Sequence, residues 1–356
     1  MARHPFGPRA GRRTRNRTYV VLALLIVAVL IAFKYGPFGK SEGETTEIDT
    51  TPDVSIDADV PKVIEQEPQP TVVLQTKPKP KPEPEPVILP EPDLPPEPTV
   101  EPNPEAGELI AKATALISER PSRIIEAREN LNKALRMPMS AQQRSGVKDQ
   151  LSKLADKWLF NRTVLPGDPL CESYQVKSGD RLSIIGERYK VPYEILLEIN
   201  KIKQAQDLQA GETIKVINGP FHATVYRSTF MMDVYLQNTY VRSFRVGLGK
   251  SGMETPTGLW RVKPGGKLVK PPWTNPIDGR TYHPEDPDYP LGSRWIGLEG
   301  LKGAAKDRTG FAIHGTKEPE QIGSAGSQGC IRMHNGDAIL VYNLLFPTFS
   351  QVEVTD

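Results

Sequence analysis

The prolines of this chain are concentrated in one segment, and they decide which part of it can form packed domains. The chain has 356 residues and 35 prolines, about twice the usual fraction, and 15 of them lie in residues 61–104. There is no Gly-X-Y repeat, which excludes a collagen triple helix. Runs such as KPKPKPEPEP at residues 77–86 remove backbone donors and favour extended polyproline II. Residues 39–104, which are also acidic, are therefore predicted to be a disordered proline-rich linker.

A basic segment and an apolar segment precede this linker. Six arginines between Arg3 and Arg17 are followed by fifteen apolar residues, YVVLALLIVAVLIAF, at residues 19–33. With the flanking segment 34–38, this run approaches the roughly 20 residues that cross a bilayer core. The sequence therefore predicts a basic cytoplasmic tail at residues 1–18 and one transmembrane anchor at residues 19–38, with the membrane as a partner. The arginines place the N-terminus inside and the remaining chain in the periplasm or cell-wall space.

A cleaved signal peptide is the alternative interpretation of this segment, because its basic and apolar parts fit that pattern too. Lys34, Tyr35, Pro37 and Phe38 occupy the positions where the small residues of a cleavage site should lie. No lipobox-type cysteine follows them. An uncleaved single-pass anchor is therefore the preferred prediction.

The distribution of charge limits the partners of the chain. Its net charge of +2 divides into eight basic groups and no acid in residues 1–40, and 37 basic and 43 acidic groups in the remainder. A basic end on an acidic chain argues against nucleic acid as a partner. Two cysteines exclude a disulfide-rich scaffold and a four-cysteine zinc site. The oligomeric state does not follow from the sequence.

Residues 105–161 show the 3.6-residue period of amphipathic helices. Three apolar stripes, at residues 109–117, 124–135 and 147–159, predict three short helices. No catalytic motif lies in this segment, so its default interpretation is a spacer or a docking module.

Residues 172–218 show the patterns of strand, helix, helix and strand in that order. The segment contains YQVKSGDRL at residues 174–182, Asn200 after the second helix pattern, and Leu208-x-x-Gly-x-x-Ile214 before the last strand. Asp180 is placed to cap the first helix.

This pattern resembles a LysM domain over its full length. The resemblance implies a small βααβ fold that binds N-acetylglucosamine-containing glycans such as peptidoglycan. Gly179, Asp180 and Arg181, with the loop at residues 202–206, are the candidate glycan-binding residues.

Residues 219–356 carry short alternating apolar runs that are typical of strands. The predicted strands lie at residues 222–226, 231–236, 241–246, 259–262, 311–313 and 351–354, and residues 338–345 are long enough for a helix. Turn signals at residues 250–252, 264–266 and 278–279 separate the runs. A mostly-β, sandwich-like domain is therefore predicted.

One cluster in this domain has the composition of a nucleophilic site. FAIHGT at residues 311–316 is followed by SQGCIRM at residues 327–333. A thiol with a pKa of about 8.5 is mostly protonated at neutral pH, so Cys330 needs a base such as His314. Gly329 lets the backbone approach a substrate carbonyl, and the Cys330 amide, with that of Gly329, is placed to donate to an oxyanion. Arg332 supplies a cation for a carboxylate-bearing substrate.

An inert buried cysteine in a loop of small residues is the alternative interpretation of this cluster. The close grouping of Ser327, Gly329, Cys330 and Arg332 after a strand-ending histidine favours a catalytic site.

These residues resemble the L,D-transpeptidase catalytic domain over about residues 220–355. The match includes ETPTG at residues 254–258, YPLG at residues 289–292, Gly323 and the Ser-x-Gly-Cys motif that ends at Cys330. The resemblance implies that Cys330 is the nucleophile, that His314 is the general base, and that Ser327 and Gly329 shape the catalytic loop. It places Arg332, Gly315, Thr316 and Gln328 at the substrate. Gln328 stands where the family often has histidine, and it can form hydrogen bonds but cannot titrate.

The resemblance also implies a reaction in two steps that needs no metal and no cofactor. Cys330 attacks the bond between the third residue and D-Ala of a tetrapeptide stem, and D-Ala leaves. An amine of a neighbouring stem, or another amine acceptor, then resolves the thioester, which gives a 3→3 cross-link in the first case. The expected function is therefore that of a membrane-anchored peptidoglycan L,D-transpeptidase. Water as acceptor would make it a carboxypeptidase or another hydrolase, and a degenerate site would leave a non-catalytic peptidoglycan-binding protein.

Other residues of the domain have less specific interpretations. The segment with Trp273, Tyr282 and Tyr289 is interpreted as an exposed loop and a candidate flap over the substrate. His334 ranks below His314 as a base. Cys171 is expected to be structural and not to form a disulfide with Cys330, because such a bond would block the nucleophile.

Overall fold

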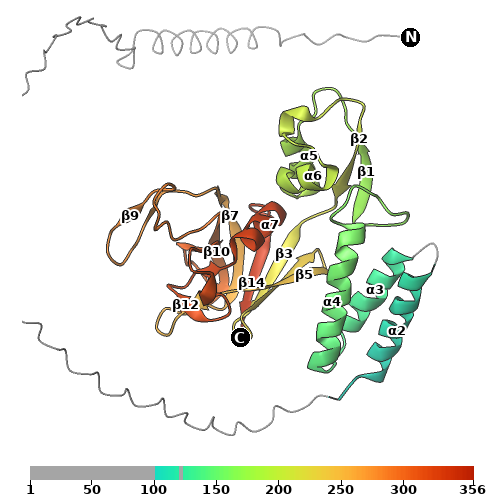
Figure 1. Ribbon diagram of the computed structural model, residues 1–356, viewed down its shortest axis with the longest axis horizontal. Coiled ribbons are helices and arrows are strands. Elements are labelled where there is room, and N and C mark those ends of the chain that lie inside the picture. The colour runs from blue at the N-terminus through green and yellow to red at the C-terminus, as the bar shows by residue number, and fades with distance from the viewer. Residues whose placement is uncertain (1–100, 120–122) are drawn as a thin grey trace, which may run out of the picture. The chain divides into compact units, whose positions relative to one another are not determined.

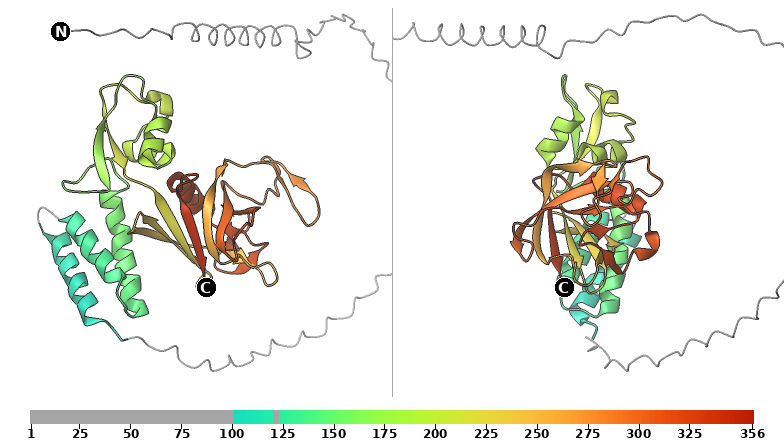
Figure 2. Two further views of the ribbon diagram at one scale, coloured as in Figure 1. Left: turned by 180° about the vertical axis from the view of Figure 1, so that it is seen from behind. Right: turned by 90° about the vertical axis from the view of Figure 1, so that its left-hand side faces the viewer.

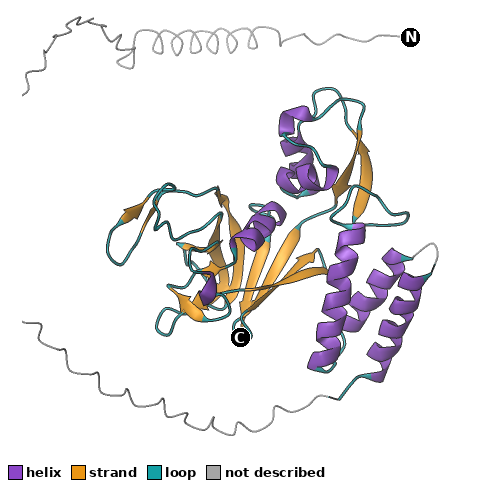
Figure 3. Cartoon of the chain, in the orientation of Figure 1, coloured by secondary structure: helices purple, strands orange, loops and turns teal. Residues whose placement is uncertain are grey.

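The computed structural model describes residues 101–119 and 123–356. They form a helical segment, a βααβ module and a mostly-β domain, in that order along the chain (Figures 1 and 3). The predicted cytoplasmic tail, the predicted anchor and residues 39–100 of the predicted linker lie outside the described residues. Within residues 101–119 and 123–356, no helix is both long enough and apolar enough to span a membrane.

Three helices follow the linker, where the apolar stripes predict them. They are α2 (Pro104–Ser118), α3 (Ile124–Leu135) and α4 (Ala141–Trp158). Asn103 caps α2 by accepting a hydrogen bond from the Ala106 amide, and Ser140 and Gln143 form a capping box at the start of α4. Gln143 also forms hydrogen bonds with both backbone groups of Asn103. The starts of α2 and α4 are therefore fixed to each other.

The second module has the predicted βααβ order. It consists of β1 (Cys171–Gln175), α5 (Leu182–Tyr189), α6 (Tyr193–Asn200) and β2 (Thr213–Ile217), and the two strands pair antiparallel. The buried Asn200 side chain donates to the carbonyls of Leu196 and Lys215 and accepts a hydrogen bond from the Lys215 amide. This asparagine therefore joins the end of α6 to β2.

The expectation that Asp180 caps the first helix of this module is wrong. The N-cap position of α5 is Arg181, whose side chain makes no capping hydrogen bond. The Asp180 carboxylate instead accepts hydrogen bonds from the Tyr174 hydroxyl and the Lys177 amide, both at 2.8 Å. It closes the turn before the helix and ties that turn to β1.

The β domain is built on an eight-stranded sheet with the order β13-β11-β10-β7-β14-β3-β4-β5. Its strands are β3 (Phe221–Tyr226), β4 (Met231–Leu236), β5 (Thr239–Arg245), β7 (Gly258–Leu268), β10 (Trp295–Gly303), β11 (Phe311–His314), β13 (Ile331–Arg332) and β14 (Gln351–Thr355). The predicted helix is α7 (Asn335–Leu344). Alternate residues of β3 and β14 are buried, as Val352 and Val354 show on β14.

The two ends of this sheet meet, so the sheet curls on itself. After β5 the chain forms β6 (Leu248–Gly249), which pairs with β12 (Ala325–Ser327). Gly247, between β5 and β6, forms an antiparallel bridge with Arg332 of β13. The predicted mostly-β domain is present as a curved sheet (Figure 2), and most of its buried apolar residues lie on the strands.

Two strand predictions need correction. The predicted turn at residues 264–266 does not end a strand, because β7 continues through it to Leu268. The extra residues form a bulge against β10, where Ile296 faces Lys267 but Leu298 faces Val262. The sequence analysis missed β10 itself, because its sequence, WIGLEGLKG, contains three glycines, which are depleted in strands.

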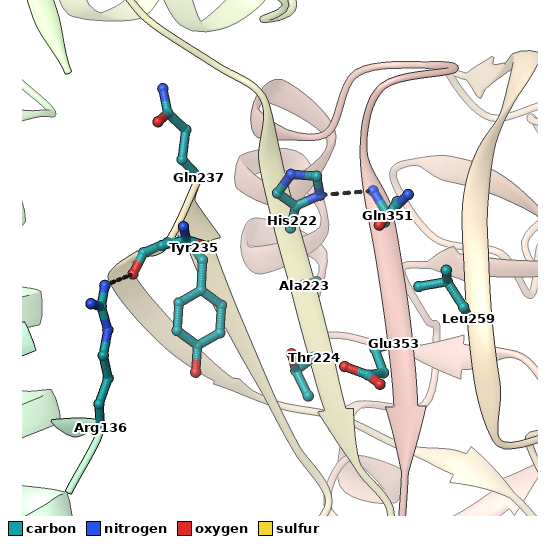
Figure 4. A pocket seen from close by; sticks show the side chains of 10 residues that line it. Arg136, His222, Ala223, Thr224, Tyr235, Gln237, Leu259, Gln351 and Glu353 are labelled. Atoms are coloured by element: carbon teal, nitrogen blue, oxygen red, sulfur yellow. Dashed lines mark hydrogen bonds between the residues drawn. The ribbon is translucent and has the colours of Figure 1, made fainter. Parts of the chain in front are cut away.

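A polar groove of about 440 Å³ lies over β3, β4, β14 and β7 (Figure 4). Arg136, His222, Tyr235 and Glu353 are among the residues that line it. His222 Nδ1 accepts a hydrogen bond from the Gln351 amide. The predicted catalytic residues all lie in the described part of the chain, and none of them lines this groove.

Buried polar contacts join the helical segment to the β domain. The Asn132 side chain on α3 accepts a hydrogen bond from the Tyr240 amide of β5 at 2.9 Å and donates to the Arg128 carbonyl. Lys148 of α4 pairs with the buried Asp233 of β4 at 2.6 Å. Within the described residues, the segment therefore packs against the sheet.

We predict that Asn132→Ala lowers the free energy of unfolding by roughly 1–3 kcal/mol, because it leaves the Tyr240 amide buried without its acceptor. Urea unfolding followed by tryptophan fluorescence measures the change. Asn130→Ala is the matched control, since the exposed Asn130 side chain donates only to the Glu126 carbonyl of its own helix. Its effect should stay below about 0.5 kcal/mol, and equal effects of the two substitutions would contradict the prediction.

Candidate active site

Strand pairing brings Cys330 and His314 to one face of the sheet. β13 runs parallel to β11, with Ile313 opposite Ile331 and His314 opposite Arg332. Side chains alternate along a strand, so the two isoleucines enter the core while His314, Arg332 and the adjoining Cys330 face the other way. The predicted nucleophile and base line the same cavity.

Internal hydrogen bonds fix the loop that carries the nucleophile. Ser327 Oγ donates to the Cys330 carbonyl at 2.6 Å and accepts a hydrogen bond from the Gly329 amide at 3.1 Å. Gly329 has a φ of +106°, and a Cβ there would lie 2.7 Å from the Phe311 ring, so only glycine fits. Because Ser327 uses the Gly329 amide, this amide is not the oxyanion donor. The Cys330 amide is the remaining candidate.

His314 is held in the tautomer that a general base needs. Its Nδ1 lies 2.6 Å from the Gly315 carbonyl, so Nδ1 carries the proton and Nε2 keeps a lone pair. The ring stacks on Trp295 at a centroid distance of 5.7 Å. Burial lowers the pKa of His314 to about 4, and the Arg332 cation acts in the same direction. The imidazole is therefore neutral at neutral pH and able to accept a proton.

Cys330 is protonated in the resting site. Burial raises the pKa of its thiol to about 11, although the Ala312 backbone and the Arg332 cation oppose this shift. The shifted pKa values thus favour a neutral thiol and a neutral imidazole in the same cavity. A neutral imidazole is suited to accept a thiol proton, which is the arrangement that general-base catalysis needs.

Arg332 lines the cavity beside the nucleophile. Its Nη1 donates to Gln321 Oε1 at 2.5 Å and to Glu318 Oε2 at 3.3 Å. Among the described residues, Arg332 Nε is buried and has no hydrogen-bond partner. An always-charged guanidinium with an unused donor is suited to the predicted carboxylate contact.

The cavity at Cys330 is small, about 100 Å³, and Trp295 and Leu291 form part of its wall. The predicted flap contributes to it as a hairpin of β8 (Trp273–Thr274) and β9 (Thr281–Tyr282), not as an irregular loop. Trp273 and Pro276 of this hairpin line the cavity, and the Trp273 ring stacks on Tyr282 at 6.0 Å. The hairpin therefore forms one wall of the catalytic cavity.

The structure separates the predicted substrate-binding residues into two groups. Gln328 and Arg332 line the cavity, but Gly315 and Thr316 do not. The Asn335 side chain donates to the Thr316 carbonyl, and its Oδ1 would lie 2.1 Å from a Cβ at Gly315. Gly315 and Thr316 thus hold His314 against the start of α7.

Two other residues that the sequence singled out, His334 and Cys171, do not line the catalytic cavity. His334 is exposed at the N-cap of α7 and does not line the cavity. Cys171 is buried, both cysteines are free, and burial raises the pKa of Cys171 to about 12.

Sequence analysis missed two residues that support the site. Thr255, buried behind the loop, accepts a hydrogen bond from the Gly249 amide and donates to the Gly329 carbonyl at 2.9 Å. Its motif was noticed, but neither residue type nor spacing shows a contact with a loop 74 residues away. Trp295 was missed because it begins the unpredicted strand β10.

The βααβ module has a cavity of its own, with a volume of about 460 Å³. Asp180 and Arg181 line it together with Tyr193 and Gln206. Gly179 does not line it, but its φ of +86° forms the adjacent turn. Two of the three candidate glycan-binding residues and part of the predicted loop therefore lie at one concave surface.

Comparison with known proteins agrees with both domains. Residues 220–354 match the L,D-transpeptidase catalytic domain, and residues 174–216 match the LysM domain. A candidate L,D-transpeptidase of Bacillus subtilis strain 168, YkuD, is 31% identical over 174 residues, which are 47% of this chain and 89% of that protein. A second candidate L,D-transpeptidase of the same strain, YqjB, is 34% identical over 139 residues, which are 39% of this chain and 73% of that protein.

A solved structure of an L,D-transpeptidase from Mycobacterium tuberculosis H37Rv is also similar. It has 15% sequence identity and a TM-score of 0.31, and the match covers 40% of this chain. The chain spans 62% of that structure, less than two thirds of its length.

A cysteine and a histidine that line one small cavity of a curled β domain fit the class of cysteine acyltransferases. The chain belongs to the L,D-transpeptidase family, and it is an L,D-transpeptidase enzyme with a LysM domain before its catalytic domain.

We predict that Ser327→Ala lowers kcat/KM by about tenfold to a hundredfold. The substitution removes hydrogen bonds to both Gly329 and Cys330, and a small displacement of a nucleophile is costly. Release of D-Ala from a tetrapeptide stem measures the rate. Ser324→Ala is the matched control, because its hydroxyl donates to the Gln321 carbonyl and forms no hydrogen bond with Gly329 or Cys330. Equal rates for the two variants would contradict the role of Ser327.

The acid limb of the kcat/KM profile should lie near pH 4, well below the ordinary histidine value of 6.5, because protonating His314 removes the base. Arg332 lowers the pKa of His314, so Arg332→Gln should move this limb to higher pH. Initial rates between about pH 3.5 and pH 9, a range of about three units on either side of the ordinary histidine pKa, test both shifts. Circular dichroism at each pH confirms that the enzyme stays folded. A wild-type limb at or above pH 6.5 would contradict the lowered pKa of His314.

Proposed function

We propose that this enzyme forms 3→3 cross-links in peptidoglycan while an N-terminal helix at residues 19–38 anchors it in the cytoplasmic membrane. Cys330 attacks the carbonyl of the third stem residue while His314 takes the thiol proton. His314 then passes this proton to the amine of D-Ala, which leaves as its bond to the carbonyl breaks and a thioester forms. The neutral His314 next accepts a proton from the amine of a second stem as that amine attacks the thioester, and it returns the proton to the departing Cys330 sulfur. The observation that carries this proposal is the neutral Cys330–His314 pair on one face of a small cavity.

The other parts of the chain support the same proposal. The LysM cavity with Asp180 and Arg181 is the proposed binding site for glycan strands. The proline-rich residues 61–104, if fully extended, reach about 140 Å, so the folded domains can meet the wall while the anchor stays in the membrane. Trp273 and Trp295 in the wall of the catalytic cavity support transfer to an amine, because apolar rings beside Cys330 make the surroundings of the thioester less favourable for water.

The full-length chain, purified in detergent and incubated with a disaccharide-tetrapeptide, should release D-Ala and form a cross-linked dimer that mass spectrometry detects. Cys330→Ala should abolish both products, because it removes the nucleophile. Cys171→Ala is the matched control and should retain them, since Cys171 is buried next to the Trp158 carbonyl and lies outside the catalytic cavity.

The products distinguish the alternatives. Loss of D-Ala without a dimer would favour hydrolysis over transfer. If the folded, full-length protein neither releases D-Ala nor forms a dimer, a peptidoglycan-binding protein without activity would be favoured. Dimer formation by Cys330→Ala would contradict the mechanism itself.

A further inference from the structure

The polar groove of Figure 4 lies outside the catalytic cavity and has no part in the reaction proposed above. Its floor is one face of the central strands, where His222 and Thr224 alternate with buried residues along β3. The strand register sets Tyr235 of β4 opposite His222, and Glu353 of β14 opposite Thr224. These side chains therefore share the face that points away from the buried residues of β3.

Arg136 turns this polar face into a groove. It lies at the C-cap of α3, and its Nη2 donates to the Asn238 carbonyl between β4 and β5 at 3.3 Å. Figure 4 shows the Arg136 side chain on one side of Tyr235, with His222 and Thr224 on the other side. The groove has a volume of about 440 Å³, which is typical of spaces that hold a small ligand. The helical segment thus encloses a space that the sheet alone would leave open.

A second cavity extends the groove along β3. Its volume is about 640 Å³, it is lined by residues of α4 and of the sheet, and it shares Tyr235 with the groove. Tyr226, two residues beyond Thr224 on the same face, lines it as well. From His222 to Tyr226 the strand advances about 13 Å. A trough of this length, with two tyrosines along it, suits an elongated ligand better than a compact one.

The lining of the groove carries no net charge. Arg136 and Glu353 are the two ionised side chains among the described residues that line it. Burial lowers the pKa of His222, so its imidazole is neutral, and its Nδ1 accepts the Gln351 amide at 3.1 Å, which leaves the proton on Nε2. The adjoining cavity also has two cationic and two anionic lining residues, namely Arg144, Lys148, Asp149 and Asp233. This balance favours an uncharged ligand over an acidic polymer.

The position of the groove disfavours the common ways of binding a peptide. β7, β14, β3 and β4 are neighbours within the sheet, and each is paired on both sides, so a peptide cannot join them as another strand. Ala223 and Leu259 are the aliphatic residues among those that line the groove, too few to hold the apolar face of a helix. A ligand in this groove must therefore be recognised by polar side chains.

The polar side chains of the groove suit hydroxyl groups. Glu353 is exposed, and within the described residues its carboxylate forms no hydrogen bond or ion pair, so both oxygens can accept. Arg136 and His222 Nε2 can donate, and the Thr224 hydroxyl can do both. Each sugar hydroxyl also donates and accepts, so adjacent hydroxyls of one ring can pair with a carboxylate and a donor together.

We propose that this groove binds a neutral glycan strand, which gives the catalytic domain a glycan site separate from the LysM cavity. This inference goes beyond the proposed cross-linking and does not depend on it. Two sites on one chain raise the affinity for a long strand, because binding at one site raises the effective concentration of the strand at the other. The enzyme then stays on its polymer while stems exchange at the catalytic cavity.

Fluorescence anisotropy of a labelled, stem-free peptidoglycan glycan strand tests this proposal with the full-length chain in detergent. Glu353→Gln should raise the Kd about tenfold, because it removes the charged acceptor. Thr224→Trp should raise the Kd at least as much, since its ring fills the groove and strands tolerate aromatic residues. Glu108→Gln, which changes an exposed carboxylate of α2 outside the groove, is the matched control and should leave the Kd unchanged.

Two further measurements show whether these effects belong to the groove. The increases in Kd should persist in a Tyr193→Ala background, because Tyr193 lines the LysM cavity. Both groove variants should acylate Cys330 with a soluble disaccharide-tetrapeptide at the wild-type rate, since neither residue lines the catalytic cavity. Circular dichroism confirms their folding independently, so a failure of the proposed cross-linking function would not affect this test.

The proposal would be overturned if both groove variants bound the glycan strand with the wild-type Kd. It would equally be overturned if they bound free stem peptides more weakly and the glycan strand unchanged, because the groove would then be a peptide site.

Discussion

The parallel pairing of β13 with β11 is the constraint on which the catalytic geometry depends. β13 contains only Ile331 and Arg332, too few residues to hold a position alone. Its place is secured by the two hydrogen bonds that Arg332 exchanges with Gly247, at 2.8 and 2.9 Å, and by the Met333 amide, which donates to the His314 carbonyl. Gly247 connects β5 to β6, so the curl of the whole sheet brings Gly247 next to Arg332. The closure that forms the core therefore also sets the nucleophile beside its base.

The same burial that organises the site decides its protonation. Removing the thiol and the imidazole from water disfavours the charged form of each, so the pKa of Cys330 rises while the pKa of His314 falls. Arg332 lowers both values, so it stabilises a thiolate at Cys330 and also favours the neutral resting imidazole of His314. A protonated resting thiol is also less susceptible to oxidation than a thiolate. The raised pKa of Cys330 therefore favours a thiol that is less prone to oxidation in the resting site.

The sequence allowed the local chemistry to be predicted, but not the contacts between distant loops. Cys330, His314, Ser327 and Gln328 could be placed at one site because short motifs carry their spacing and chemistry. The support from Thr255 depends on a loop far away in the chain, and no local pattern encodes it. The strand β10 lacks a clear alternating pattern because glycines interrupt it, and β7 conceals a bulge that resembles a turn. Each of these errors arose where tertiary pairing outweighs local preference.

Buried charged side chains connect the helical segment to the two domains that follow it. Lys215 of β2 is 1% exposed, and its Nζ donates to the Trp158 carbonyl, at the last residue of α4, and to the Thr163 carbonyl. A cation at a helix C-terminus satisfies carbonyls that lack partners within the helix and opposes the negative end of its dipole. The LysM module thus caps the helix whose other contacts, such as Lys148 with Asp233, bind the catalytic sheet. Because the cost of burying each charge is offset only when its partners are in place, these contacts disfavour independent movement of the two domains. Within the described residues, the helical segment therefore acts as a structural connection between the LysM domain and the catalytic domain.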